Sequence, residues 1–196
     1  MSKPTFSPQN AMLLLIDHQV GTMGWVRSVP FETMKRHAIT LARSAAATGM
    51  PVVLTSSQEE RAQGPLLPEL EKILPKEFAA RIKRAGIVNC WKDPAFTAAA
   101  KAPGRKNLIM AGVTNNVCTV YPAISAVQEG YAVQVVADAG GSPSQFADEI
   151  ALQRMKDNGV VLTTTNQCIA ELAQDWSSPD RSKLMQVLYE EVLSKL

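Results

Sequence analysis

Ala11-Met12-Leu13-Leu14-Leu15-Ile16 is a continuous apolar run that ends at Asp17. A short run without polar alternation is typical of a strand that is buried on both faces of a parallel sheet. Apolar residues then recur at helical spacing over 31–48 and stop at Gly49, and a second apolar segment follows over 51–55. This order of strand, helix and strand predicts a βαβ unit.

The same pattern continues along the chain. It predicts further strands at 106–113, 131–137 and 160–163, helices at 116–129 and 144–158, and one more strand near 80–84. About six strands that alternate with helices predict an α/β fold, a doubly wound three-layer sandwich with a mostly parallel sheet. No repeat or linker divides the sequence, so we expect a single domain over 1–196. Its C-terminal helix, 180–196, is available to pack on a neighbouring subunit.

The composition excludes several classes of function. The chain is 46% hydrophobic and 19% charged, and its formal net charge is only +2, with acidic and basic residues interspersed. Such a chain has no basic patch that would bind nucleic acid or an anionic membrane, so we expect a small-molecule substrate. The first ten residues lack the apolar stretch of a secretory signal, and no run approaches the length of a transmembrane helix. We therefore expect a cytoplasmic protein.

Three cysteines, Cys90, Cys118 and Cys168, are far apart in the sequence and form no CxxC pair. This pattern favours a reducing compartment over a disulfide framework or a zinc knuckle. Only Cys118 follows a predicted strand-to-helix turn, with Thr114 or Asn115 as a candidate N-cap. The first turn of a helix favours a thiolate, so we expect a lowered thiol pKa and backbone N–H groups that can hold an oxyanion. The other two cysteines are predicted to be small buried hydrophobic residues.

A thiol nucleophile needs a base and a nearby cation. Asp17 emerges from the end of the first strand, where a carboxylate needs a partner unless it only caps the next loop. Lys83 and Arg84 lie in the predicted strand at 80–84, where successive side chains point to opposite faces, so only one of them can reach the site. The sequence has no G-x-G-x-x-G, P-loop or G-x-S-x-G motif, and no cofactor is predicted.

The sequence resembles the isochorismatase-like cysteine hydrolase superfamily over nearly the whole chain. The resemblance is carried by Asp17, by the basic pair Lys83-Arg84 before Asn89-Cys90-Trp91, and by the segment 111–119 around Cys118. The resemblance implies a parallel sheet and an Asp, Lys, Cys triad, with Cys118 as nucleophile and Asp17 as base. It places Arg84, in preference to Lys83, at the position of the family's lysine. That choice stays open, and an arginine would remain charged and would not shuttle protons.

The resemblance also implies a cis peptide bond at Val113–Thr114 and an oxyanion hole built from the backbone N–H groups of Thr114 and Cys118. The nicotinamidase branch of the superfamily binds zinc through one Asp and two His in the loop after the second strand. Here that loop, Ser56–Arg61, contains no histidine, so we expect the metal-free branch and no metal. A homo-oligomer is also implied.

The resulting hypothesis is an amidohydrolase-like enzyme that cleaves a C–N bond of a small molecule through an acyl-enzyme on Cys118. Gln19 is predicted to steady the attacking groups, and Trp25 and Trp91 to wall the substrate pocket. Two alternatives remain open. One is an isochorismatase-type vinyl-ether hydrolase, which can do without the cysteine, and the other is a non-catalytic scaffold with a redox-sensitive thiol.

Overall fold

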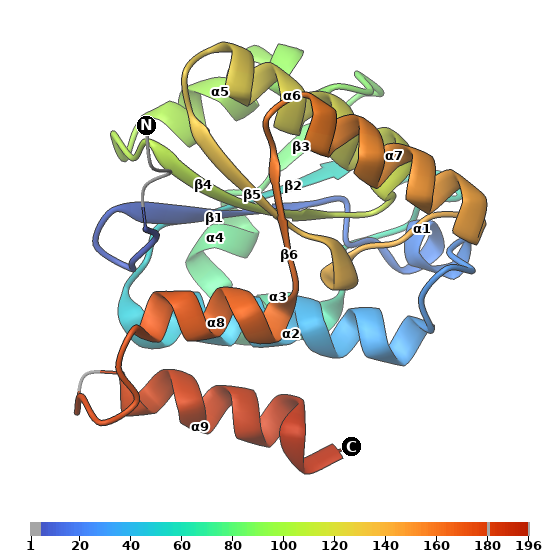
Figure 1. The fold of residues 1–196 in the computed structure, drawn as a ribbon. Helices are drawn as coiled ribbons and strands as arrows, with labels where there is room; N and C mark the ends of the chain where they lie inside the picture. The colour runs from blue at the N-terminus through green and yellow to red at the C-terminus, as the bar shows by residue number, and fades with distance from the viewer. Residues whose placement is uncertain (1–4, 180, 196) are drawn as a thin grey trace.

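The computed structural model describes residues 5–179 and 181–195. Within them, six strands form one parallel sheet in the order β3-β2-β1-β4-β5-β6 (Figure 1). The strands are β1 (Ala11–Ile16), β2 (Val52–Ser57), β3 (Ile82–Arg84), β4 (Asn107–Gly112), β5 (Ala132–Val136) and β6 (Val161–Thr163). The order reverses direction at β1 and β4, which is the topology of a doubly wound sheet. The predicted fold class is confirmed.

Helices cover both faces of the sheet (Figure 1). One layer contains α2 (Phe31–Thr48), α3 (Pro68–Ile73) and α8 (Thr165–Ala173), and α9 (Ser182–Glu191) packs on the outer side of α2 and α8 (Figure 1). The opposite layer contains α5 (Pro94–Lys101), α6 (Val120–Gln128) and α7 (Gln145–Asp157). Two short helices, α1 (Val20–Gly24) and α4 (Pro75–Ala79), lie in the connections. No helix among the described residues combines the length and the apolar character needed to cross a membrane.

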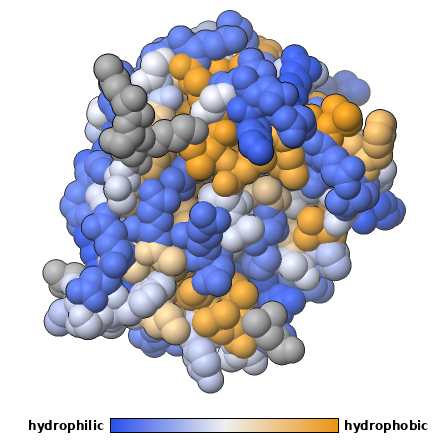
Figure 2. Space-filling view, viewed as in Figure 1, coloured by the Kyte–Doolittle hydropathy of each residue, from blue (hydrophilic) through white to orange (hydrophobic). Residues whose placement is uncertain are grey.

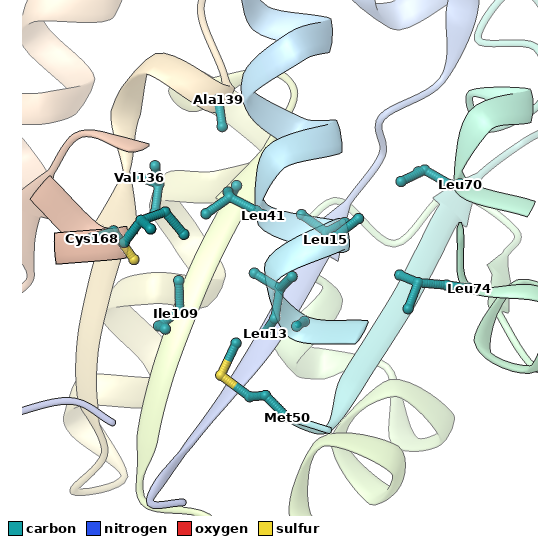
Figure 3. Packing of buried hydrophobic residues seen from close by; sticks show 14 of the residues in the cluster. Leu13, Leu15, Leu41, Met50, Leu70, Leu74, Ile109, Val136, Ala139 and Cys168 are labelled. Carbon is teal, nitrogen blue, oxygen red and sulfur yellow. The ribbon is translucent and has the colours of Figure 1, made fainter. Parts of the chain in front are cut away.

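The apolar run of β1 lies at the centre of the sheet and is at most 1% exposed at every position. Its residues alternate between the two cores. Leu13 and Leu15 pack with Leu41 of α2 (Figure 3), whereas Met12 and Leu14 pack with α5 and α6. Burial on both faces explains why this strand carries no polar residue before Asp17. On the outside, hydrophilic residues cover most of the face seen in Figure 2, and hydrophobic residues form separate patches.

The C-terminal helix α9 packs against its own chain. Leu184 and Leu188 are buried in the core beside α2, and Arg43 of α2 bonds Glu190 at 2.7 Å and Glu191 at 2.5 Å. The opposite face of α9 is open, with Met185 37% and Tyr189 58% exposed. Contact with a neighbouring subunit therefore remains a prediction for that outer face, and positions 180 and 196 of the predicted helix lie outside the described residues.

Two elements differ from their predicted form. The helix predicted over 116–129 is divided into a π-helical turn, Asn115–Thr119, and α6. The strand predicted near 80–84 begins only at Ile82, because α4 and the turn after it occupy residues up to Arg81. The first difference falls at the carboxyl edge of the sheet, where Cys118 lies.

Candidate active site

The carboxyl ends of β1, β3 and β4 meet at one edge of the sheet. Asp17 directly follows β1, Arg84 is the last residue of β3, and Cys118 lies in the turn that follows β4. All three line one cavity of about 340 Å³. Small-molecule sites span roughly 300–1,000 Å³, so this volume suits a small ligand. The structure thus brings together the three residues that the sequence singled out as nucleophile, base and cation.

Asp17 and Arg84 form a buried ion pair. The Nη2 of Arg84 lies 2.5 Å from each carboxylate oxygen of Asp17, and both side chains are 1% exposed. The Nε of Arg84 donates to Thr55 Oγ1 at 3.0 Å, and its Nη1 donates to the carbonyl oxygen of Ile87. Every nitrogen of the guanidinium therefore donates to a protein acceptor, which a buried cation requires.

Lys83 points away from the site. Its side chain is 57% exposed, and its Nζ lies 3.0 Å from Glu59 Oε2. Arg84 is therefore the basic residue that contacts Asp17, as the alternation of side chains along a strand demands.

Burial raises the pKa of Asp17 above its ordinary value. The charge of Arg84, its hydrogen bond and a hydrogen bond from the Cys118 thiol all act in the opposite direction without cancelling the effect of burial. A carboxylate with a raised pKa is a stronger base than an exposed one. Asp17 thus lines the same cavity as the thiol and is a stronger base than an exposed carboxylate.

The turn that holds Cys118 departs from an ordinary helix N-terminus. The peptide bond between Val113 and Thr114 is cis, as the resemblance implies. The carbonyl oxygen of Thr114 accepts from the backbone N–H groups of Val117 at 3.3 Å, Cys118 at 2.9 Å and Thr119 at 3.1 Å. Because of this π-helical turn, the N–H of Cys118 is engaged, contrary to the expected oxyanion hole. The N–H of Thr114 donates to no oxygen among the described residues.

The prediction of a lowered pKa for Cys118 is wrong. Burial raises the pKa of the thiol, and the negative charge of Asp17 and its hydrogen bond to the thiol raise it further. The Thr114 backbone and the charge of Arg84 lower it by less. A helix terminus therefore does not decide the charge of this thiol, because a carboxylate lies beside it in a buried setting. The thiol of Cys118 is therefore protonated at rest.

The three predicted substrate-binding residues have different surroundings. Gln19 lines the cavity, but its side-chain nitrogen donates to the carbonyl oxygens of Ser57 at 2.9 Å and Gly64 at 2.5 Å. Its Oε1 accepts from the Ser57 N–H at 2.8 Å. Gln19 therefore holds the loop after β2 in place and has little left to offer a ligand. Trp25 lines the cavity and is 47% exposed, as a wall residue should be.

Trp91 does not line the cavity, so its prediction as a pocket wall is wrong. It is 2% exposed, and its Nε1 donates to Glu129 at 2.9 Å. Its ring packs edge-on against Phe96 and Tyr131 in the core on the α5 and α6 side. A large aromatic ring gains more free energy from this burial than from a position at a cavity rim.

Sequence reasoning missed a buried polar group behind the Cys118 turn. Asp148 of α7 accepts hydrogen bonds from Asn115 Nδ2 at 3.1 Å and from Ser142 Oγ at 2.6 Å. The N–H of Asn115 also donates to the carbonyl oxygen of Gly141 at 2.7 Å. A Cβ at Gly140 would lie 2.4 Å from the carbonyl oxygen of Gly112, so only glycine fits there. The Gly140-Gly141 pair was the signal of this close approach.

The described residues contain no group of three or more His, Cys, Asp or Glu side chains that could hold a metal ion. The acids near the site are engaged with other partners. Asp17 binds Arg84, Asp148 binds Asn115 and Ser142, and Glu59 binds Arg81 at 2.7 Å.

An α/β sheet with a buried Asp–Arg pair next to a cysteine after the fourth strand is the arrangement of an isochorismatase-like hydrolase. The Isochorismatase domain matches residues 11–167, and the chain belongs to this family. It is 37% identical over 178 residues to a probable hydrolase of Escherichia coli, YcaC, covering 90% of this chain and 85% of that protein.

Two solved structures are similar over nearly their whole length. YcaC from Pseudomonas aeruginosa, described with hexane-2,5-diol and covalent acrylamide, has a TM-score of 0.93 at 33% identity and covers 99% of this chain and 95% of its own. YcaC from Escherichia coli, described as an octameric hydrolase of unknown specificity, has a TM-score of 0.92 at 35% identity. The match covers 98% and 94% of the two chains. Together with the family, these relatives support a hydrolase.

Proposed function

We propose that this chain is a cysteine hydrolase that cleaves a C–N bond of an amide-type small molecule through an acyl-enzyme on Cys118. The observation that carries the proposal is the grouping at the cavity wall: the Cys118 thiol and the Asp17 carboxylate line the same cavity, and Asp17 is held by Arg84. A nucleophile, a base and a group that orients the base are the parts that nucleophilic catalysis requires.

In the first half of the reaction, Asp17 takes the proton of the thiol while the sulfur of Cys118 bonds to the carbonyl carbon. The C–N bond then breaks, and Asp17 returns the proton to the leaving nitrogen, which departs as ammonia or an amine. Thr114 offers its open N–H to the oxyanion. Arg84 remains charged throughout and keeps the carboxylate oriented.

In the second half, Asp17 accepts a proton from a water molecule whose oxygen attacks the thioester carbon. The C–S bond breaks, the thiol of Cys118 recovers the proton, and a carboxylic acid leaves. Burial of Asp17 supports both halves, because its raised pKa lets one carboxyl group alternate between base and acid.

The relatives add two supports. Acrylamide is an electrophile that reacts with thiols, so the covalent acrylamide described for the Pseudomonas aeruginosa protein is what a nucleophilic cysteine in this fold would form. The octameric Escherichia coli protein favours a homo-oligomer for this chain as well. Three free cysteines fit a reaction in a reducing cytoplasm.

The proposal is tested by a screen of small amides, ureides and hydrazides for ammonia or amine release. We expect turnover by the unmodified protein and by Cys168→Ala, whose thiol is buried in the core away from the cavity. Cys118→Ala should be folded by circular dichroism and inactive. Amidase activity that survives in Cys118→Ala would refute the acyl-enzyme.

A further inference from the structure

The electrostatics of the active-site cavity indicate its substrate class. The ionisable side chains among its lining residues are Asp17, Arg84 and Cys118. The Asp17 and Arg84 charges cancel each other in their buried pair, and the pKa of Cys118 is raised, so the resting thiol carries no charge. The cavity wall therefore has no net charge.

Arg84 cannot serve as an anchor for an anionic substrate. Its Nη2 is directed at both oxygens of Asp17, its Nε at Thr55 and its Nη1 at the carbonyl of Ile87, and its side chain is 1% exposed. The next basic residue along the strand, Lys83, is turned towards Glu59. A carboxylate or phosphate in the cavity would lose its hydration without gaining a counter-ion, which is strongly unfavourable.

The rest of the wall is apolar or carries neutral amides and hydroxyls. Trp25, Val88 and Val117 line the cavity and are 47%, 52% and 39% exposed, and Pro143 lies beside them on the lining. Exposed apolar groups around a concave site favour a ligand that covers them. This wall lies on loops and turns next to Cys118, so a ligand attached to the sulfur would reach it.

We propose that the cavity selects neutral amides with an apolar arm, and that it rejects substrates with a carboxylate or phosphate on that arm. The proposal rests on the assignment of Cys118 as the reactive group. It adds to that assignment the two features that a substrate must have: no charge near the reacting carbonyl, and an apolar group that lies against Trp25 and Val88.

Alkylation of Cys118 tests the charge rule without any turnover. In a Cys90→Ala/Cys168→Ala background, second-order rate constants are measured for iodoacetamide and iodoacetate by intact-protein mass spectrometry, with 2-mercaptoethanol as the reference thiol. Both reagents meet the same thiol, so its pKa cancels in their ratio. We expect the ratio of iodoacetamide to iodoacetate rates at Cys118 to exceed the reference ratio by about tenfold. A ratio equal to or below the reference overturns the rule.

A cation placed in the cavity should reverse this preference. Val88→Lys puts an unpaired ammonium on the wall and is expected to raise the iodoacetate rate relative to the iodoacetamide rate. Ile150→Lys, at a 57% exposed position of α7 that is not part of the cavity lining, is the matched control and should leave the ratio unchanged. An equal shift in both variants would mean that the net charge of the protein, and not the cavity, governs the ratio.

The apolar arm is tested with 2-iodo-N-phenylacetamide. It should alkylate Cys118 faster than iodoacetamide does, by more than the same pair differs with 2-mercaptoethanol. Trp25→Ala should lower this gain, and Trp176→Ala, 42% exposed and outside the cavity lining, should not. If the phenyl group does not increase the alkylation rate of Cys118 beyond its effect with 2-mercaptoethanol, the requirement for an apolar arm is overturned. These outcomes are independent of the amidase screen, so loss of the substrate rule and loss of the proposed function are distinguishable.

Discussion

The Nη2 of Arg84 is shared equally by the two carboxylate oxygens of Asp17, at 2.5 Å from each. This geometry explains why an isochorismatase-like site can carry an arginine where the resemblance implies a lysine. The longer side chain reaches Asp17 from the end of β3, while its other nitrogens bond Thr55 and Ile87 and fix its orientation. The cation thereby becomes part of the scaffold that holds the base.

Replacing one partner of this pair should lower the stability of the fold more than replacing both. Arg84→Met leaves the Asp17 carboxylate buried without a partner and should lower the free energy of unfolding by about 3–5 kcal/mol at neutral pH. The double variant Asp17→Asn/Arg84→Met should be more stable than Arg84→Met alone, because asparagine carries no charge and tolerates the φ of 57° at this position. Urea denaturation of the unmodified protein, Asp17→Asn, Arg84→Met and the double variant measures the coupling between the two residues. If the two single substitutions changed the free energy of unfolding additively, the predicted coupling between Asp17 and Arg84 would be wrong.

Asp148 should control the reactivity of Cys118 from behind the turn. Asp148→Ala removes the acceptor of both Asn115 and Ser142, and we expect a loss of about 2–3 kcal/mol in the free energy of unfolding. The alkylation rate of Cys118 should fall with it. Asp148→Asn keeps one acceptor oxygen and should recover part of both quantities. If the alkylation rate stayed unchanged in Asp148→Ala, the network would only stabilise the fold.

His18 should make the fold sensitive to mild acid. It is fully buried, and burial lowers its pKa from 6.5 to about 4, although its Nε2 bonds the carbonyl of Ala139 at 2.8 Å. Below pH 6.5 the unfolded imidazole binds a proton and the folded one does not, so stability is full above that pH and is lost as the pH falls towards 4. The loss should reach about 3 kcal/mol.

The measurement for His18 is the free energy of unfolding by urea at a series of pH values from 4 to 7.5. His18→Gln keeps a side-chain nitrogen that can donate to Ala139 but cannot titrate. Its curve should be flatter than that of the unmodified protein over this range. If the free energy of unfolding of His18→Gln and of the unmodified protein fell equally with pH, another group would be the cause of the acid sensitivity.

The outer face of α9 is expected to contact a neighbouring subunit. Light scattering coupled to size exclusion should show a homo-oligomer, and Met185→Glu/Tyr189→Glu should lower its mass. Leu184 and Leu188, which hold α9 on its own chain, are untouched by this change. Phe146→Glu, at a 74% exposed position on α7, tests the alternative face. If Phe146→Glu dissociated the oligomer and Met185→Glu/Tyr189→Glu did not, the interface would be assigned to α7 and not to α9.

The fold was predictable because its main signals are local. The central strand has apolar residues on both faces, so its run is uninterrupted, and helices such as α2 end at the residue that the sequence indicates, before Gly49. Because ligands gather at the carboxyl ends of parallel strands, the sequence also predicted that Asp17, Cys118 and one of Lys83 and Arg84 would lie together. The family that the chain resembles was confirmed by the family match.

The errors came from effects that no local pattern carries. The pKa of Cys118 depends on burial and on a carboxylate one hundred residues away in the sequence. The direction of Trp91 depends on the space between α5 and α6, and the hydrogen bond that occupies the Cys118 N–H depends on a π-helical turn. Each is a tertiary property, which propensity and spacing do not encode.

The exposed residues of the cavity wall contribute less to the stability of the fold than the reactive groups of the cavity do. Asp17 and Arg84 are buried at strand ends and Cys118 is partly buried, whereas Trp25, Val88 and Val117 lie on the surface around the opening. Substitutions at such exposed positions usually change stability by less than about 0.5 kcal/mol. Substrate preference is therefore the property of this scaffold that can drift most freely. A library restricted to these wall positions should yield variants that remain folded and reactive while differing in what they accept.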